Sequence, residues 1–182
     1  MLRRFSCSPS APSRGINVML KLMLCFLMLS GGAFAQVQPS PEIIKKDIES
    51  LQGAVNDVVG ITVPGFGVLQ AARGTYLEGY GVVVTLELAL EPPRNPFTAL
   101  KSPGDVRTNV GQRRKNTEEK LSDLLKQRTP LLESIVPAES ATIIVYLLNT
   151  NPADLPDLPS QIVLSVKKQD AASGLVSIRE YK

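Results

Sequence analysis

The stretch GTYLEGYGVVVTLELALEPP, residues 74–93, decides the fold class of this chain. Between residues 82 and 91, alternate positions form an apolar row, which includes Val84 and Leu86, and a mixed row, which includes Glu87. This period of two predicts a β-strand with its apolar row against a core and its mixed row partly in solvent. The double proline that follows cannot continue a hydrogen-bonded ladder, so the strand is expected to end there.

The glycines ahead of this strand predict a tight turn rather than a phosphate-binding loop. Gly79 and Gly81 can adopt the positive φ that such a turn needs, so residues 68–78 are expected to form the first strand of a hairpin. Tyr80 stands where a phosphate-binding loop carries its lysine, and the segment leads into a strand instead of a helix. Tyr76 and Tyr80 are candidate partner-binding residues; the alternative is that both rings cap the edge of the sheet.

An amphipathic helix is expected after the polar residues 36–40. Ser40 can cap its first turn, Pro41 fits the first helical position, and Glu42 suits the positive end of the helix dipole. The apolar residues that follow are spaced by four, three, four and three positions, as on one helix face. They are Ile44, Ile48, Leu51, Val55 and Val58. Gly60 is expected to end this helix.

A long loop is expected over residues 92–115, because this stretch is rich in proline and glycine and shows little periodicity. A second helix is expected from Asn116, where an asparagine with a glutamate three positions later matches a capping box. Pro130 should kink this helix or split it into two short pieces. Arg107, Arg113, Arg114 and Lys115 form a basic cluster that could contact anionic lipid or peptidoglycan acids. Arg113 and Arg114 are its candidate partner-binding residues; the alternative is a solvated loop.

The last third of the chain is expected to contribute two main strands. Residues 140–148 are apolar on both faces, which predicts a central strand covered on both sides, or on one side with an oligomer contact on the other. Residues 161–168 alternate and predict a half-buried strand. The tail, residues 175–179, fits an edge strand or a short helical turn. The order is therefore α-β-β-α-β-β, and the expected α+β fold has one antiparallel or mixed sheet with two helices packed on one face.

Residues 1–35 have the pattern of a signal peptide, with Met19 as an alternative start. A short apolar core ends in an A-x-A site, so cleavage is expected between Ala35 and Gln36. One globular α+β domain is expected over residues 36–182. No later run approaches about 18 apolar residues, so no transmembrane helix is expected after the signal is removed.

The charge balance and the positions of the cysteines indicate where the protein is located and which kinds of partner it can have. The chain has 20 basic and 17 acidic residues; residues 1–35 hold four of the basic ones and no acids, so the mature domain has 16 against 17, a net of −1. This balance argues against nucleic acid as a partner. Both cysteines, Cys7 and Cys25, lie before residue 36, and the mature domain has no N-x-S/T sequon. A secreted or periplasmic bacterial protein is therefore expected.

The residue types that the sequence lacks also limit the catalytic and metal-binding chemistry open to the protein. The chain has no histidine and its mature part has no cysteine, which removes histidine general bases, thiolate nucleophiles and zinc sites with nitrogen or sulfur ligands. No metal, cofactor or catalytic residue is assigned. The expected function is a non-catalytic binding or assembly module of the cell envelope, whose partner is another protein, an envelope component or a second copy in a homo-oligomer. The alternative is an envelope hydrolase that uses carboxylates or a serine–lysine pair, such as Ser165 and Lys167 on one strand face.

Overall fold

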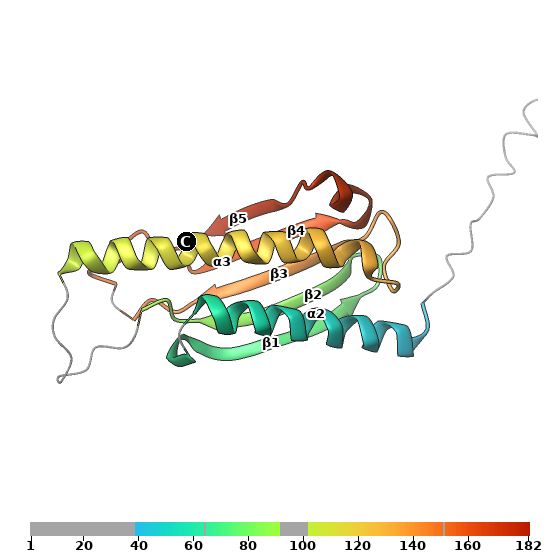
Figure 1. Cartoon of the computed structure of the whole chain (residues 1–182), viewed down its shortest axis with the longest axis horizontal. Helices are drawn as coiled ribbons and strands as arrows, with labels where there is room; N and C mark the ends of the chain where they lie inside the picture. Colours follow the sequence, from blue (N-terminus) through green and yellow to red (C-terminus); the bar gives the residue numbers. More distant parts are fainter. Residues whose placement is uncertain (1–38, 64, 92–101, 151) are drawn as a thin grey trace, which may run out of the picture. The chain divides into compact units, whose positions relative to one another are not determined.

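The computed structural model of the protein describes residues 39–63, 65–91, 102–150 and 152–182. These residues form an α+β fold in which two long helices lie on one face of a mixed sheet (Figure 1). The elements are α2 (Pro41–Thr62), β1 (Val68–Leu77), β2 (Gly81–Leu88), α3 (Pro103–Arg128), β3 (Ser140–Leu147), β4 (Gln161–Lys167) and β5 (Ser177–Tyr181). Short 3-10 helices span Gly65–Gly67, Thr129–Leu131 and Lys168–Ser173.

The sheet contains five strands in the order β1-β2-β3-β4-β5. Neighbours pair antiparallel except β2 and β3, which are parallel and run in register from Gly81 opposite Ser140 to Leu88 opposite Leu147. A parallel pair needs a long crossover, and α3 supplies it. Helix α2 packs on β1 and β2, and α3 packs on β3 and β4 (Figure 1). The predicted mixed sheet with helices on one face is confirmed.

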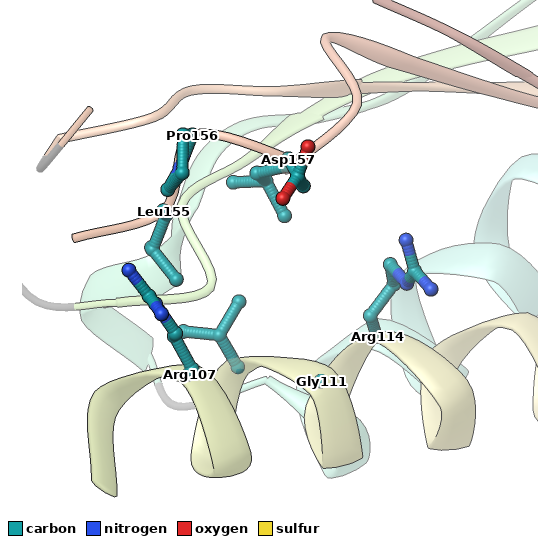
Figure 2. A pocket seen from close by; sticks show the side chains of 8 residues that line it. Arg107, Gly111, Arg114, Leu155, Pro156 and Asp157 are labelled. Carbon is teal, nitrogen blue, oxygen red and sulfur yellow. The ribbon is translucent and has the colours of Figure 1, made fainter. Parts of the chain in front are cut away.

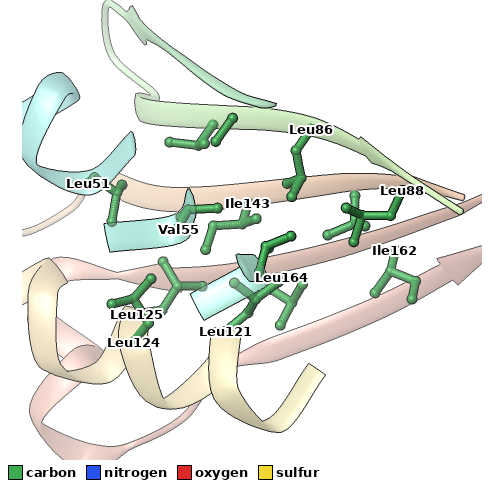
Figure 3. Packing of buried hydrophobic residues seen from close by; sticks show 14 of the residues in the cluster. Leu51, Val55, Leu86, Leu88, Leu121, Leu124, Leu125, Ile143, Ile162 and Leu164 are labelled. Carbon is green, nitrogen blue, oxygen red and sulfur yellow. The ribbon is translucent and has the colours of Figure 1, made fainter. Parts of the chain in front are cut away.

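The core lies between the sheet and the two helices (Figure 3). The apolar row of β2 faces inward as predicted, because Val84 is fully buried and Leu86 is 2 % exposed. Leucines and valines of the two helices pack against the inward-facing apolar residues of β3 and β4. The largest fully buried side chains include Leu51, Val55, Leu121, Leu125, Ile143 and Leu164. The spacing of apolar residues on α2 therefore marks a core face, and its N-cap is Ser40, as predicted.

β3 is central in the sheet, as predicted, but helices cover only one of its faces. Ile143 and Val145 point into the core, whereas Ile144 is half-buried and Tyr146 is 47 % exposed on the other face. Among the described residues, no helix lies over this second face (Figure 1). Within the described part of the chain, helices therefore cover β3 on one face and not on both, and we call the other face of the sheet the open face.

The predicted loop is wrong from residue 103 onward, because α3 already begins there; residues 92–101 lie outside the described part of the chain. Ser102 is the N-cap: its Oγ accepts a hydrogen bond from the Asp105 N–H at 3.1 Å and donates to Asp105 Oδ2 at 2.7 Å. Pro103 follows at the first helical position. Asn116, predicted as the cap, lies in the helix interior. The structural reason is burial of Val106 and Val110, which offsets the unfavourable helix propensity of the local glycines.

The end of α3 also differs from the prediction. The helix stops at Arg128, and Pro130 sits inside a 3-10 turn instead of kinking a longer helix. Leu132 and Ile135 are buried beyond that turn, outside any helix. The tail forms the edge strand β5, which settles the alternative between strand and helix. Within the described part of the chain, none of the helices has the length and apolar character needed to cross a bilayer.

Candidate functional site

The four candidate partner-binding residues do not converge on one site. The Tyr76 hydroxyl donates to Glu139 Oε1 at 3.3 Å, on the side of the sheet that faces the helices. Tyr80 lies on the open face, with its hydroxyl 3.1 Å from Thr142 Oγ1. Arg113 donates from Nη1 to the carbonyl oxygen of Leu90 at 2.7 Å and so ties α3 to the end of β2. The proposed cleavage site at Ala35 and Gln36 lies outside the described residues.

Arg114 lines a pocket of about 280 Å³ between α3 and the loop that joins β3 to β4 (Figure 2). We call it the arginine pocket. The helix contributes residues at spacings of three, one and three positions, which lie on one face of a helix. They are Arg107, Val110, Gly111 and Arg114. The loop contributes Leu155, Pro156, Asp157 and Leu158.

The floor of the arginine pocket is apolar and its two ends are cationic. Val110 is 2 % exposed and Leu155 is 6 % exposed, so both belong to the core as well as to the floor. Gly111 also lines the pocket, and a Cβ added there would meet no atom within 4 Å, so the space around it is open. Arg107 and Arg114 stand two helical turns apart at opposite ends of the pocket, as Figure 2 shows.

The two arginines differ in how they are held. The Arg107 Nε donates to the carbonyl oxygen of Asp154 at 2.8 Å, and no described residue accepts a hydrogen bond from its two terminal nitrogens. Arg114 pairs with two acids: its Nε lies 3.4 Å from Glu118 Oε1, and its Nη1 lies 3.3 Å from Glu180 Oε1. Arg107 is therefore the more available cation, and Arg114 is a fixed wall of the pocket.

Glu118 sits where the arginine pocket meets the core. Its side chain is 17 % exposed, and burial raises the pKa of its carboxyl group although the charge of Arg114 acts in the opposite direction. The Arg114 Nε and the Glu118 Oε1 are both buried without an aligned hydrogen bond, so the contact is an ion pair only. Asp157, the acid of the pocket loop, is 88 % exposed and pairs with Lys182 Nζ at 3.2 Å.

A second, wider pocket of about 490 Å³ lies on the open face of the sheet, beside β4 and β5. Tyr80, Ser165 and Lys167 are among its lining residues. A chain of hydroxyl contacts runs from Tyr80 through Thr142 to Ser165, whose Oγ lies 2.8 Å from Thr142 Oγ1. Among the residues that the structure describes, Asp170 is the single carboxylate that lines this pocket, and Asp157 is the single one that lines the arginine pocket. Neither pocket therefore presents two converging carboxylates.

Sequence reasoning missed most of the arginine pocket. Arg114 was a candidate and Arg107 belonged to the same basic cluster, but Gly111 and Leu155, Pro156 and Leu158 were not assigned to a site. The usable signal was the helical spacing from Arg107 to Arg114, which becomes visible only when the helix is placed to begin at residue 103. Comparison of the chain with protein-family models, with curated proteins and with solved structures finds no match.

Proposed function

We propose that this protein is a non-catalytic binding module of the bacterial cell envelope, and that its arginine pocket takes a small anion with an apolar part. The observation that carries the proposal is the position of the Arg107 guanidinium group, whose two terminal nitrogens donate to no described residue, beside a buried apolar floor. Export to a secreted or periplasmic location is proposed from residues 1–35 alone. A carboxylate or phosphate on a short hydrocarbon chain has the matching chemistry.

The physical basis is the geometry of arginine. A guanidinium group presents a planar fork of donors that fits the two oxygens of a carboxylate or phosphate. The floor formed by Val110 and Leu155 would cover the hydrocarbon part of such a ligand, with a contribution of about 0.8 kcal/mol for each buried CH₂ group. Arg114 is already neutralised by two acids, so it shapes the pocket more than it attracts the anion.

Isothermal titration calorimetry with octanoate and with 1-octanol tests the proposal on the purified domain, residues 36–182. We expect octanoate to bind and Arg107→Gln to weaken it by at least about tenfold, since hydrogen bonds to charged groups contribute about 1.5–3 kcal/mol. Arg128→Gln is the matched control, because Arg128 is exposed on the same helix outside the pocket. Equal affinity for octanoate and octanol, or equal effects of the two substitutions, would contradict the proposal.

An envelope hydrolase is the second proposal, and one observation favours it: Ser165 and Lys167 line the same open-face pocket. The hydrogen bond of the Ser165 Oγ goes to the hydroxyl of Thr142, which is no general base. The serine is therefore not activated in this arrangement. Labelling with a serine-directed fluorophosphonate separates the two proposals. A binding module stays unlabelled, whereas a label that disappears in Ser165→Ala would establish the hydrolase.

A further inference from the structure

The two edge strands of the sheet, β1 and β5, differ in whether their outward backbone groups already have hydrogen-bond partners. At the β1 edge, the backbone N–H of Ala72 donates to Asn56 Oδ1 at 2.8 Å, and that of Gly74 donates to Gln52 Oε1 at 3.1 Å. Both acceptors belong to α2, so these two donors are not offered to another strand. The β1–β2 register also shifts twice before Arg73, and such irregularities discourage strand addition. The β1 edge is therefore blocked by its own chain.

The described residues give the β5 edge no such protection. β5 is the last strand of the sheet, and all five of its residues are exposed. Among the described residues, only β4 and the adjoining Ser160 make hydrogen bonds to its backbone. Antiparallel pairing with β4 uses alternate residues, so the remaining N–H and C=O groups point away from the sheet. An unpaired edge of this kind is a template for another strand.

The exposed apolar residues of this segment are spaced symmetrically about Ile178. Leu175 is 72 % exposed, Ile178 is 45 % exposed and Tyr181 is 46 % exposed, and each is three residues from the next. In a two-fold antiparallel pair centred on Ile178, the two copies of Ile178 face each other. Leu175 precedes β5 by two residues, and it lies opposite Tyr181 of the other copy when the pairing extends that far beyond the strand. Every exposed apolar side chain of the edge would gain an apolar neighbour across the pair.

The charges are compatible with this register and exclude two of its neighbours. Centring the pair on Ile178 places Arg179 opposite Ser177 and Glu180 opposite Val176 of the second copy, so no like charges are opposed. Centring it on Arg179 or on Glu180 would place two identical charges directly opposite each other, which is destabilising. Centring the pair on Ile178, Arg179 or Glu180 leaves the open faces of the two sheets on the same side of the combined sheet. A pair centred on Ser177 also opposes no like charges, but it places Leu175 opposite Arg179 and Tyr181 opposite Ser173. The register centred on Ile178 is therefore favoured by the charges and the apolar contacts together.

We propose that β5 pairs antiparallel with β5 of a second copy of this chain about a two-fold axis at Ile178. Two five-stranded sheets then become one continuous sheet. The open-face pocket gains a wall from the second copy, because Leu175 and Tyr181 already line it. The pairing does not depend on ligand binding in the arginine pocket, so either idea can fail without the other.

Light scattering coupled to size exclusion tests the pairing on residues 36–182. A pair formed through one short strand has a small interface, so masses should be followed up to about 500 µM. We expect a dimer that becomes a monomer in Ile178→Lys, where two cations would meet at the axis. Leu131→Lys, at a site 67 % exposed on the turn after α3, is the matched control and should stay dimeric. A monomeric wild type, or a dimeric Ile178→Lys, overturns the proposal.

A second variant keeps the test independent of folding effects. The mature domain has no cysteine of its own. In Ile178→Cys the two thiols should lie across the axis, so a short bis-maleimide is expected to yield a covalent dimer. Leu131→Cys should remain largely uncross-linked under the same conditions. Equal yields for the two variants would show that cross-linking reflects random collision and would overturn the proposed axis.

Discussion

Gly81 is the position at which one added carbon atom should do the most damage. Its φ is +117°, and an added Cβ would overlap the carbonyl oxygen of Ser140 and lie 2.9 Å from the Ser140 nitrogen. Backbone strain in a non-glycine residue at such an angle costs about 1–3 kcal/mol. Relief of overlap in a packed region adds about 1–3 kcal/mol. Gly81→Ala should therefore lower the free energy of unfolding by about 4 kcal/mol.

Gly79→Ala is the matched control. Its φ is +75°, but an added Cβ would meet no atom within 4 Å, so only the backbone term of about 1–2 kcal/mol applies. Urea unfolding followed by circular dichroism measures both. With a slope of about 2 kcal/mol per molar urea, the midpoint should fall by about 2 M for Gly81→Ala and by less than about 1 M for Gly79→Ala. Equal shifts would refute the claim that the start of the β2–β3 pair excludes a side chain.

Three further substitutions test the core, the helix and the ion pair. Asp47→Ala should cost about 1–3 kcal/mol in a urea titration, because it leaves the buried Ser134 N–H, now 2.7 Å from Asp47 Oδ2, without an acceptor; a loss near zero would contradict this. Gly111→Ala should raise the free energy of unfolding by about 1 kcal/mol through helix propensity, because an added Cβ would meet no atom within 4 Å; a lower melting temperature than that of the wild type would contradict this. Burial raises the pKa of Glu118 in the native state above its unfolded value of 4.5. The native state therefore binds a proton more readily than the unfolded state, and the contribution of this residue to stability falls as the pH rises from 4.5 through the raised native pKa. The advantage of the wild type over Glu118→Gln should thus be larger at pH 4 than at pH 7; thermal unfolding at both pH values that shows the reverse order would contradict the raised pKa.

Local patterns were sufficient for the hairpin and the first helix. The alternation in β2 and the positive φ at Gly79 and Gly81 follow from neighbouring residues, and both are found. The start of α3 is different, because Gly104 and Gly111 are poor helix formers by themselves. Burial against the rest of the fold stabilises this part of α3, and that burial depends on residues that are distant in the sequence.

The candidate site depended on contacts that are distant in the sequence. Arg107 and Leu155 come from separate elements and meet only because α3 crosses the sheet. Arg113 and Arg114 are adjacent in sequence, and successive residues on a helix point about 100° apart. Arg113 therefore binds the end of β2 while Arg114 faces the pocket and β5. Grouping them as one basic cluster was consequently misleading.

The parallel pairing of β2 with β3 also has a kinetic consequence. Gly81 must find Ser140, 59 positions further along the chain, before the centre of the sheet exists. Contacts of such long sequence separation slow folding, because the chain loses entropy before the contact repays it. Until then β1 is the only strand paired with β2, so a nascent or truncated chain that stops short of residue 140 exposes the unpaired edge of β2 and should aggregate.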